Sequence, residues 1–418
     1  MIDLVQTADS PADITTAGVR LRRVVDETDF KIAEVLGVFE TWAARLGARE
    51  LDAIPGVPFL RLWLRRGTLE PILARELGSA ALQGGWTADG RAQLKPFPVG
   101  VVGHWPAGNI EIQPLLSMTC ALLGGNAALV RIPSGLVEVT RRLIQLLADS
   151  DPERSVLSKL HFTVFEHTQQ DLLQAMAESV DGAMIWGGKE AVLNVRSLPF
   201  PHWARLAVFG PRISVAAMDA ATWSDPQQHA TWCQRIARDV WQFDQQACSS
   251  PQTLLLEKRE SQSIDGFVSA LRRAFAAENQ AHPRLTIPAA LTSAICQARA
   301  SWLLDDTAHQ ALFPPGPDWT LLVGRGAVIP QPTQGKTLTV LEVDNLFDPV
   351  AKFDGNVQTL GLAIADPEKE VKLAELAARR GVDRIVKLGR MHVFIPPWDG
   401  ADLIRPMVRM VRHVVSKE

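Results

Sequence analysis

The sequence contains no tyrosine and only four cysteines among its 418 residues. The missing tyrosine excludes one side chain that enzymes use as a general acid. The cysteines form no CxxC pair and have no spacing typical of a metal site, so they favour free thiols in a reducing compartment over a disulfide framework. We therefore expect a cytoplasmic protein with unpaired cysteines, which are Cys120, Cys233, Cys248 and Cys296.

The chain also has no strong excess of charge, since its formal net charge is −3. It carries neither the basic field that binds nucleic acid nor a polybasic tail for an anionic membrane. The N-terminus lacks the basic and apolar regions of a signal peptide, and no apolar run approaches the length that spans a bilayer. We expect no nucleic-acid partner and no membrane span, and the length allows about two to three domains around a large core.

Several motifs of common enzymes are absent. The chain has no GxGxxG fingerprint and no Walker A loop, and it has no HExxH zinc signature and no GxSxG serine elbow. The nine histidines are scattered, so we expect no metal site. A cysteine–histidine pair remains open at this point, because its two members need only meet in space.

Alternating strands and helices are present from Pro96 onwards. The apolar runs "PFPVGVVGHWP", "NAALVRI" and "LHFTVFE" are typical of buried strands, and helical patterns separate them. This alternation predicts βαβ units and a mostly parallel sheet with helices on both faces. The second half of the chain also alternates strands and helices, so it is expected to be another α/β unit. The first 95 residues are expected to be mainly helical, with an amphipathic helix over residues 29–47.

Cys248 lies in the stretch "WQFDQQACSSPQ", between a predicted helix that starts near Ser224 and the predicted strand "QTLLLEK". Catalytic groups are often displayed on such connections. A free cysteine is nevertheless more often a small buried hydrophobic residue, so position alone leaves both interpretations open. Cys120, Cys233 and Cys296 fall within helical patterns, where we expect core positions.

Two glycine-containing turns follow predicted strands. In "HWPAGN", Gly108 and Asn109 are typical of a plain turn, but the Asn109 amide could also donate to a developing oxyanion. In "IWGG", Gly187 and Gly188 are consistent with a tight turn or with close approach of the backbone to a dinucleotide. Each signal is weak by itself.

Taken together, four segments resemble the long-chain acyl (acyl-CoA) reductases of the bacterial luciferase system, a branch of the aldehyde dehydrogenase superfamily. They are "GHWPAGNIEIQPLLSMTCALLGGNAALVRIPS", "AMIWGGKEAV", "FDQQACSSPQ" and "GVDRIVKLGRMHVFIPPWDG". The resemblance implies an aldehyde-dehydrogenase-like α/β fold with two α/β domains. The expected parts are a helical N-terminal arm (1–95), a Rossmann-like nucleotide-binding domain (96–240), a catalytic domain (241–398) and a C-terminal helix (399–418).

The resemblance also implies roles for individual residues. Cys248 matches the acylated nucleophile, and Asn109 falls where the superfamily has its oxyanion-hole asparagine. The implied cofactor contacts include Arg131, which replaces a lysine at the adenosine ribose, and Glu342 at the nicotinamide ribose. The remaining implied cofactor contacts are Ser134, Trp186, Gly187 and Gly188.

The implied activity is the NADPH-dependent reduction of an acyl thioester, carried on coenzyme A or on a carrier protein, to an aldehyde through an acyl-cysteine. Val208, in "VFGPR", replaces the glutamate that hydrolytic aldehyde dehydrogenases use as a base. NADPH is expected because "RIPSGLV", from Arg131 to Val137, contains no acid. A cysteine acyltransferase or thioesterase without nucleotide, and a catalytically silent interaction module, stay as alternatives. A homo-oligomer is expected.

Overall fold

The computed structural model describes residues 4–284, 286–304 and 310–414. The chain forms two compact units, and the first of them is built from two separate stretches of sequence. Met1–Pro211 and Phe394–Glu418 make up unit 1, whereas Arg212–Val393 make up unit 2. Each unit has its own parallel sheet.

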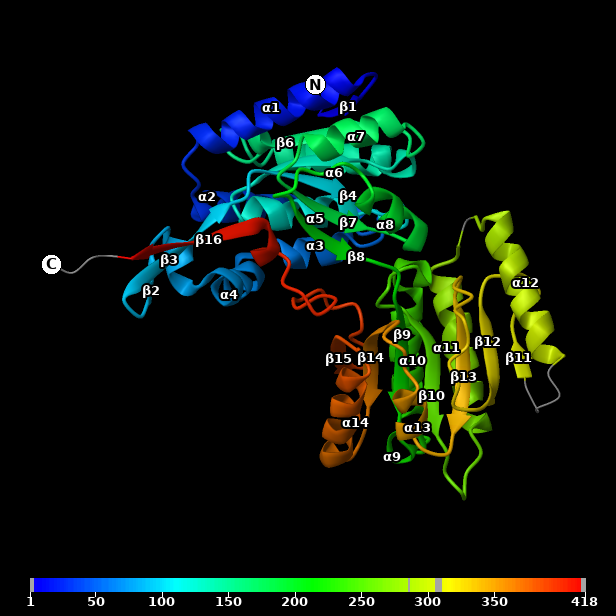
Figure 1. Ribbon diagram of the computed structural model, residues 1–418. Helices are drawn as coiled ribbons and strands as arrows, with labels where there is room; N and C mark the ends of the chain where they lie inside the picture. The colour runs from blue at the N-terminus through cyan, green and yellow to red at the C-terminus, as the bar shows by residue number, and fades with distance from the viewer. Residues whose placement is uncertain (1–3, 285, 305–309, 415–418) are drawn as a thin grey trace. The chain divides into compact units, whose positions relative to one another are not determined.

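Six parallel strands form the sheet of unit 1. They are β1 (Val5–Thr7), β4 (Val101–Trp105), β5 (Ala127–Arg131), β6 (Leu160–Val164), β7 (Gly182–Trp186) and β8 (Arg205–Phe209). Their order across the sheet is β1-β6-β5-β4-β7-β8 (Figure 1). The chain therefore builds outwards from β4 to β6 and then returns to the other side of β4, which is the doubly wound arrangement of nucleotide-binding folds.

Helices cover both faces of this sheet. The helices of unit 1 are α1 (Pro11–Glu27), α2 (Ile32–Arg45), α3 (Val57–Trp63), α4 (Arg66–Leu77), α5 (Gln113–Leu123), α6 (Val137–Ala148), α7 (Gln170–Glu178) and α8 (Lys189–Arg196). Apolar residues of α1, α7 and α8 share one buried cluster with alternate residues of β4, β5 and β7, and α1 and α7 lie side by side in Figure 1. Helix α5 packs on the opposite face, where its Ser117 Oγ lies 2.7 Å from Nδ1 of His104 in β4. Burial on both faces explains why β4 and β7 are apolar at nearly every position.

A small antiparallel sheet in unit 1 joins the two stretches of its sequence. It contains β2 (Thr87–Asp89), β3 (Ala92–Pro98) and β16 (Val408–Val414), in the order β16-β3-β2. Val408 pairs with Pro98 and Val414 with Ala92. The predicted C-terminal helix is therefore wrong for residues 408–414, because these residues complete a sheet with a strand that lies about 310 residues earlier in the chain.

Unit 2 has a seven-stranded sheet with one antiparallel edge strand. Its strands are β9 (Ile213–Met218), β10 (Pro251–Glu257), β11 (Gln310–Leu312), β12 (Thr320–Arg325), β13 (Thr337–Val343), β14 (Val357–Ala363) and β15 (Arg384–Lys387), in the order β11-β12-β13-β10-β9-β14-β15. Only β11 runs antiparallel to its neighbour. Its helices are α9 (Ala220–Trp223), α10 (His229–Trp241), α11 (Asp265–Ala281), α12 (Ala289–Leu303), α13 (Phe347–Ala351) and α14 (Pro367–Arg379).

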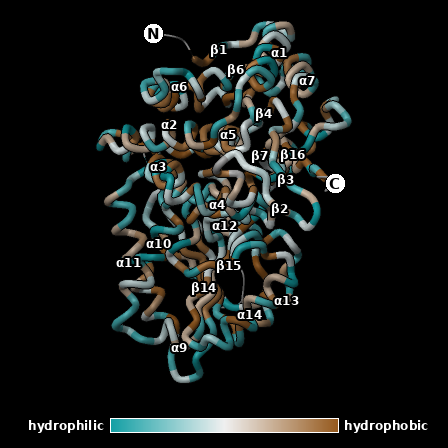
Figure 2. Tube along the Cα trace, turned by 90° about the vertical axis from the view of Figure 1, so that its left-hand side faces the viewer, coloured by the Kyte–Doolittle hydropathy of each residue, from teal (hydrophilic) through white to brown (hydrophobic). Residues whose placement is uncertain are grey.

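The side chains of the unit 2 strands alternate between two cores. Ala216 and Leu254 face the cluster formed with α10 and α11, whereas Val215 and Leu255 face the cluster formed with α13 and α14. This alternation follows from the two-residue period of a strand. All seven residues of β14 are buried, and brown, hydrophobic segments lie beside its label in Figure 2.

The boundaries between the units differ from the predicted ones in two ways. The N-terminal helices do not form a separate arm, because Ile14 and Leu21 of α1 lie in the core of unit 1 and β1 pairs with β6. The change from one unit to the other falls at Pro211 and not at residue 240. The physical reason is that β9 hydrogen-bonds to β10 and β14 and so belongs to the second sheet.

No helix in the part of the chain that the structure describes is both long and apolar enough to cross a bilayer. Within the same described residues, no group of three or more His, Cys, Asp or Glu side chains is arranged to hold a metal ion.

Candidate active site

The carboxyl ends of the unit 1 strands form one edge of the sheet, and this edge contains a topological switch point. The chain leaves β4 towards β5, whereas it leaves β7 towards β8, on the opposite side. The connections after β4 and β7 therefore diverge, and open α/β sheets typically bind their ligands at such a switch point.

The structure brings six residues with predicted roles to this edge. Asn109 lies in the turn after β4, and Arg131 ends β5 with Ser134 just beyond it. Trp186 ends β7, and Gly187 and Gly188 lead into α8. These residues come from three neighbouring parallel strands, so the sheet topology alone accounts for their proximity.

Gly188 fits the close approach of a phosphate group. It is the N-cap of α8, and its backbone has an ordinary extended conformation with φ −67° and ψ 168°. A Cβ atom added at Gly188 would meet no described atom within 4 Å. Neither backbone conformation nor packing requires glycine here, whereas a pyrophosphate against the N-terminus of a helix would require the space. The residues at this edge therefore fit a dinucleotide.

Trp186, which precedes the Gly187–Gly188 turn, is held by contacts with its neighbours. Its ring stacks on Phe209 with a centroid distance of 3.8 Å, and its Nε1 donates to Ser117 Oγ at 2.9 Å. The side chain is buried, so its main role in this structure is to hold the end of β7. Burial also lowers the pKa of the neighbouring His104 to about 3, so that imidazole is neutral.

An acidic residue that was not predicted from the sequence lies beside the end of β5. Glu166, which follows β6, accepts a hydrogen bond from Ser134 Oγ at 2.7 Å. Arg131 donates from Nε to the Phe165 carbonyl at 3.2 Å, and its guanidinium lies 5.3 Å from the centre of the Phe165 ring. Burial lowers the pKa of Arg131, and the charge of Glu166 opposes that shift. The cationic Arg131 and the anionic Glu166 thus lie close together in the region where a Rossmann fold binds the adenosine ribose.

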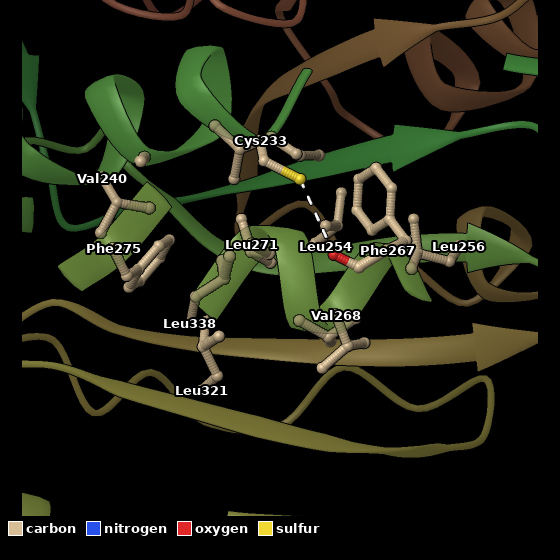
Figure 3. Close-up of a cluster of buried hydrophobic side chains, with 14 of the residues drawn as sticks. Cys233, Val240, Leu254, Leu256, Phe267, Val268, Leu271, Phe275, Leu321 and Leu338 are labelled. Atoms are coloured by element: carbon tan, nitrogen blue, oxygen red, sulfur yellow. Dashed lines mark hydrogen bonds between the residues drawn. The ribbon is translucent and has the colours of Figure 1, made fainter. Parts of the chain in front are cut away.

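Cys248 differs from the other cysteines in its surroundings. It is partly exposed and lies between the 3₁₀ turn Gln242–Gln245 and β10. Cys120 and Cys233 are buried in α5 and α10, as expected for core positions. Figure 3 shows Cys233 among apolar side chains, with its Sγ directed at the Phe267 carbonyl at 3.8 Å. Burial raises the pKa of Cys233 to about 12, so this thiol stays protonated.

Cys296 departs from its predicted core position. It lies on α12 as expected, but its side chain is exposed. The helix packs through Ile295 and Arg299, which are buried, and this turns the neighbouring Cys296 to the surface.

Three consecutive left-handed residues precede the loop that contains Cys248. Phe243, Asp244 and Gln245 have φ values of 53°, 54° and 61°. This conformation costs roughly 1–2 kcal/mol for each residue other than glycine. Such strain persists only where the surrounding structure fixes it, and it is concentrated at functional sites.

Polar contacts fix this left-handed turn. The Gln245 amide donates to the Pro251 carbonyl at 2.9 Å and to the Thr337 carbonyl at 2.8 Å, and it accepts from the Thr337 N–H at 2.8 Å. Asp244 pairs with Arg284 at 2.5 Å and with Lys336 at 3.4 Å, and both of these cations have nearly fully buried side chains. The start of the loop is thereby tied to β13.

Hydrogen bonds anchor the carbonyl of Cys248 and the side chain of the residue that follows it. Ser214 of β9 donates from Oγ to the Cys248 carbonyl at 2.6 Å. The next residue, Ser249, lies with its Oγ 2.9 Å from Nδ1 of His392, and His392 Nε2 lies 2.7 Å from the Asp239 carbonyl. Sequence reasoning missed Ser214 and His392, because nothing in the residue pattern indicates that these distant segments meet.

The predicted contact of Glu342 with the nicotinamide ribose stays a prediction, and the structure gives only its position in the sheet. The strands β10 and β13 are parallel, and Glu342 is paired with Leu256, whereas Cys248 precedes the start of β10 at Pro251. Five residues of strand separate the levels of Pro251 and Glu342, or about 16 Å at 3.3 Å per residue. Glu342 and Cys248 therefore lie at different ends of the strands of this sheet. Glu342 accepts a hydrogen bond from Arg325 at 2.7 Å.

The loop before β13 lies at the same end of the strands as Cys248. Thr337 starts β13 and is bonded to Gln245, so the preceding residues "QPTQGK" share the edge of the sheet with Cys248. The rule that residues before parallel strands share one edge would have indicated this loop from the sequence.

Comparison with known proteins identifies the family of the chain. The family model described as "Acyl-CoA reductase (LuxC)" matches residues 40–413. A long-chain acyl-protein thioester reductase from Vibrio harveyi is 24% identical over 353 residues, covering 84% of this chain and 71% of that protein. The protein of that name from Aliivibrio fischeri is also 24% identical, and the match covers 70% of it.

Solved structures with the same fold are aldehyde dehydrogenases and their relatives. Glyceraldehyde-3-phosphate dehydrogenase GapN from Methanocaldococcus jannaschii, solved with NADP, has a TM-score of 0.70 at 12% identity and covers 100% of this chain and 99% of that one. An aldehyde dehydrogenase from Brucella melitensis biovar abortus has a TM-score of 0.71 at 11% identity. Bifunctional proline utilization A also has a TM-score of 0.71, although this chain corresponds to only 45% of its length. The aldehyde-dehydrogenase-like α/β fold predicted from the sequence is confirmed, and the chain belongs to the acyl-CoA reductase (LuxC) family.

Proposed function

We propose that this acyl reductase uses NADPH to reduce an acyl thioester to an aldehyde through an acyl-Cys248 intermediate. The observation that carries the proposal is a partly exposed cysteine, after a left-handed turn, whose carbonyl and following residue are held by hydrogen bonds. Membership of an acyl reductase family supplies the reaction class. The relatives are named for acyl-protein thioesters, which supports a protein-borne acyl group, and acyl-coenzyme A is the other carrier to be tested. The homo-oligomer and the cytoplasmic location stay predictions.

Cys248 carries the covalent step. Its thiolate attacks the thioester carbonyl, the tetrahedral intermediate expels the carrier thiolate, and a thioester to Cys248 remains. Covalent catalysis of this kind divides one difficult reduction into two easier steps. The Ser214 contact to the Cys248 carbonyl holds the peptide while the thiol reacts.

Oxyanion stabilisation is assigned to the side-chain amide of Asn109 and to the backbone N–H of Cys248. Negative charge develops on the former carbonyl oxygen, and a fixed donor at that oxygen is typically worth about 3 kcal/mol of barrier. Asn109 lies in an exposed turn, as a group that meets substrate must.

The reduced nicotinamide supplies a hydride to the acyl carbon when the dinucleotide is bound. In this proposal Gly187 and Gly188 admit the pyrophosphate, and Arg131 with Ser134 contacts the adenosine ribose. After hydride transfer, Cys248 holds a thiohemiacetal. Its collapse releases the aldehyde and returns the thiolate.

Mass spectrometry of the intact protein tests the proposal directly. Incubation with long-chain acyl thioesters, in the absence of nucleotide, should add one acyl mass to the parent protein and none to Cys248→Ala. Addition of NADPH should then remove the acyl mass and release aldehyde. Cys233→Ala is the matched control, because this core thiol should affect stability and not labelling. Aldehyde formation by Cys248→Ala at more than a trace rate would refute the mechanism.

A thioesterase or acyltransferase remains the competing activity, and His392 is the observation that raises it. A cysteine hydrolase needs a base that can take the thiol proton. His392 is a poor base for this purpose, because its ring is buried and both nitrogens already lie within hydrogen-bond distance of Ser249 and Asp239. Persistence of the acyl-protein without nucleotide supports the reductase, and rapid release of free acid would favour the hydrolase.

A further inference from the structure

We propose that His392 is a positioning residue for Cys248, acting through the hydroxyl group of Ser249. This inference rests on the proposed function only in taking Cys248 as the nucleophile. His392 lies 144 residues after Cys248 in the sequence, and nothing in the chemistry proposed above uses it. Its contact with the residue next to the nucleophile therefore calls for a role.

The hydrogen-bond partners determine the tautomer of His392. The Asp239 carbonyl can only accept, so the imidazole Nε2, at 2.7 Å, must carry the proton. Asp239 belongs to the last turn of α10, whose final carbonyls lack partners within the helix. Burial lowers the pKa of His392 to about 4, so the ring is neutral at physiological pH. Its Nδ1 is therefore an acceptor.

Ser249 must then donate its hydroxyl hydrogen to His392 Nδ1, at a distance of 2.9 Å. Ser249 is buried, with an exposed fraction of 3%, so it cannot meet a substrate in place of Cys248. Its hydroxyl instead fixes the side chain that follows the nucleophile. Together with the Ser214 contact on the Cys248 carbonyl, this bond fixes both ends of the peptide unit that joins Cys248 to Ser249.

The segment that carries His392 is itself held firmly. The Gly389 N–H donates to an Asp239 carboxylate oxygen at 2.7 Å. Arg384 donates to the Met391 carbonyl at 3.3 Å and to the Val393 carbonyl at 2.8 Å, which flank His392 on both sides. The Phe243 ring packs against the imidazole with a centroid distance of 5.5 Å. The histidine is thus a fixed point from which the loop is aligned.

Two substitutions at position 392 test the contacts of the two imidazole nitrogens one at a time. Asparagine at position 392 places an amide oxygen near the former Nδ1 and can still accept from Ser249. Glutamine places its amide near the former Nε2, so it can cap the Asp239 carbonyl but leaves Ser249 without its acceptor. His392→Gln is therefore the test variant and His392→Asn is its matched control.

The readout is the alkylation of Cys248 by iodoacetamide, followed on its own peptide by mass spectrometry. The exposed Cys296 provides an internal reference in the same molecule. Misplacement of a reacting group by about 1 Å can cost around 100-fold in rate. We expect His392→Gln to slow alkylation and acylation of Cys248 by roughly 10- to 100-fold, with little change in the KM for the acyl thioester, whereas His392→Asn should remain close to the parent.

Ser249→Ala keeps the test independent of folding defects at position 392. It should slow Cys248 to a similar extent, and the double variant Ser249→Ala/His392→Gln should be no slower than Ser249→Ala alone, because both changes remove the same contact. Equal rates in His392→Gln and the parent, equal losses in the glutamine and asparagine variants, additive effects in the double variant, or a parallel fall at Cys296 would each overturn the proposal. Alkylation needs neither nucleotide nor thioester, so this outcome is independent of whether aldehyde is formed.

Discussion

Arg131 and Glu166 place opposite charges beside Ser134, at the ends of neighbouring strands. An arginine near the adenosine ribose accommodates the 2′-phosphate of NADPH, whereas a carboxylate accepts the 2′-hydroxyl of NADH. Glu166 is already engaged by the Ser134 hydroxyl, which reduces its availability as an acceptor for the ribose. We therefore expect the charges at the ends of β5 and β6 to favour NADPH over NADH.

Substitution of these two residues should move the cofactor preference in opposite directions. Arg131→Ala should weaken NADPH binding and narrow its advantage over NADH, because the cation is lost. Glu166→Gln should widen that advantage by about 10-fold, since removal of one nearby charge is worth on the order of 1.4 kcal/mol in a partly exposed site. Calorimetric titration with each nucleotide measures both effects, and Glu138→Gln on the exposed start of α6 is the control for net charge. Equal or better binding of NADH by the parent protein would contradict the NADPH assignment.

Val208 leads us to expect that the enzyme does not readily hydrolyse its acyl-Cys248 intermediate. Val208 packs partly buried against the core of unit 1, and the sequence resemblance implies that hydrolytic aldehyde dehydrogenases have a glutamate at this position. General-base help to an attacking water contributes about 10²–10⁴-fold, so its absence should let acyl-Cys248 persist without nucleotide.

A carboxylate at position 208 should restore hydrolysis. Val208→Glu is expected to release free acid from the acyl thioester faster than the parent, provided that the half-buried charge is tolerated. Val208→Gln controls for side-chain size without supplying a base. The rate of acid release without nucleotide is the measurement. Rapid acid release by the parent itself would show that another base exists.

Individual residues also show where the sequence was sufficient and where it was not. Gly188 and Arg131 followed strands that could be recognised from their apolar runs, so their shared edge was predictable. The distance along the strands between Glu342 and Cys248 could not be foreseen, because a local motif does not show which ends of two strands lie side by side. Glu166 and His392 could not be foreseen, since each meets its partner only through the folded arrangement of distant segments.

At the scale of elements, the turn between α10 and β10 contains three consecutive left-handed residues. Gln245 makes three hydrogen bonds to the backbone of Pro251 and Thr337, and its own backbone is left-handed. The side chain therefore offsets an unfavourable conformation while it ties the loop to β13.

Truncation of Gln245 should reveal both effects. Gln245→Ala leaves buried backbone groups without partners and should lower the free energy of unfolding by about 2–4 kcal/mol. Gln245→Gly loses the same bonds but removes the left-handed penalty, so it should be less damaging by about 1 kcal/mol. Urea unfolding measures the difference, with the exposed Gln280→Ala as control. An alanine variant as stable as the glycine variant would argue against strain at this position.

The elements that were predictable are those whose pattern is local. The amphipathic pattern of residues 29–47 corresponds to α2, and the run "LHFTVFE" corresponds to β6. The strand β16 was mistaken for a helix because its mixed sequence "VRMVRHV" has no clear period of its own and its partner β3 is remote in the chain. Short strands in small sheets depend on pairing more than on intrinsic preference.

For the whole molecule, buried titratable groups should make the two units respond differently to acid. Burial lowers the pKa of His104 to about 3 and that of His161 to about 4, both in unit 1. Unfolded histidine titrates near 6.5, so between about pH 4 and 6.5 the unfolded state binds more protons than the folded state. The stability of unit 1 should therefore fall as the pH drops through this window.

Unit 2 contains two groups whose effects oppose each other. His392 behaves like the histidines of unit 1, but burial raises the pKa of Asp239 to about 7, above its unfolded value of about 3.9. Protonation of Asp239 stabilises the folded state as the pH drops from 7 towards 4, which compensates for His392.

Hydrogen exchange at pH 7 and pH 5, corrected for the intrinsic rates, should show this difference. Amides of β4 and β5 in unit 1 should lose more protection at pH 5 than those of β9 and β10 in unit 2. Asp239→Asn removes the compensation and should make unit 2 acid-sensitive as well. Equal losses of protection in both units of the parent protein would contradict this distribution of proton-linked stability.

The antiparallel sheet of unit 1 has a consequence for synthesis on the ribosome. Strand β3 emerges early, but β16, which covers one of its edges, emerges only after the whole of unit 2. Throughout that interval the nascent chain exposes an unpaired strand edge, and such an edge can pair with another chain. Slow translation of unit 2, or ribosome stalling within it, should therefore favour association between neighbouring nascent chains, and a chaperone that shields residues 92–98 would have its greatest effect during this time.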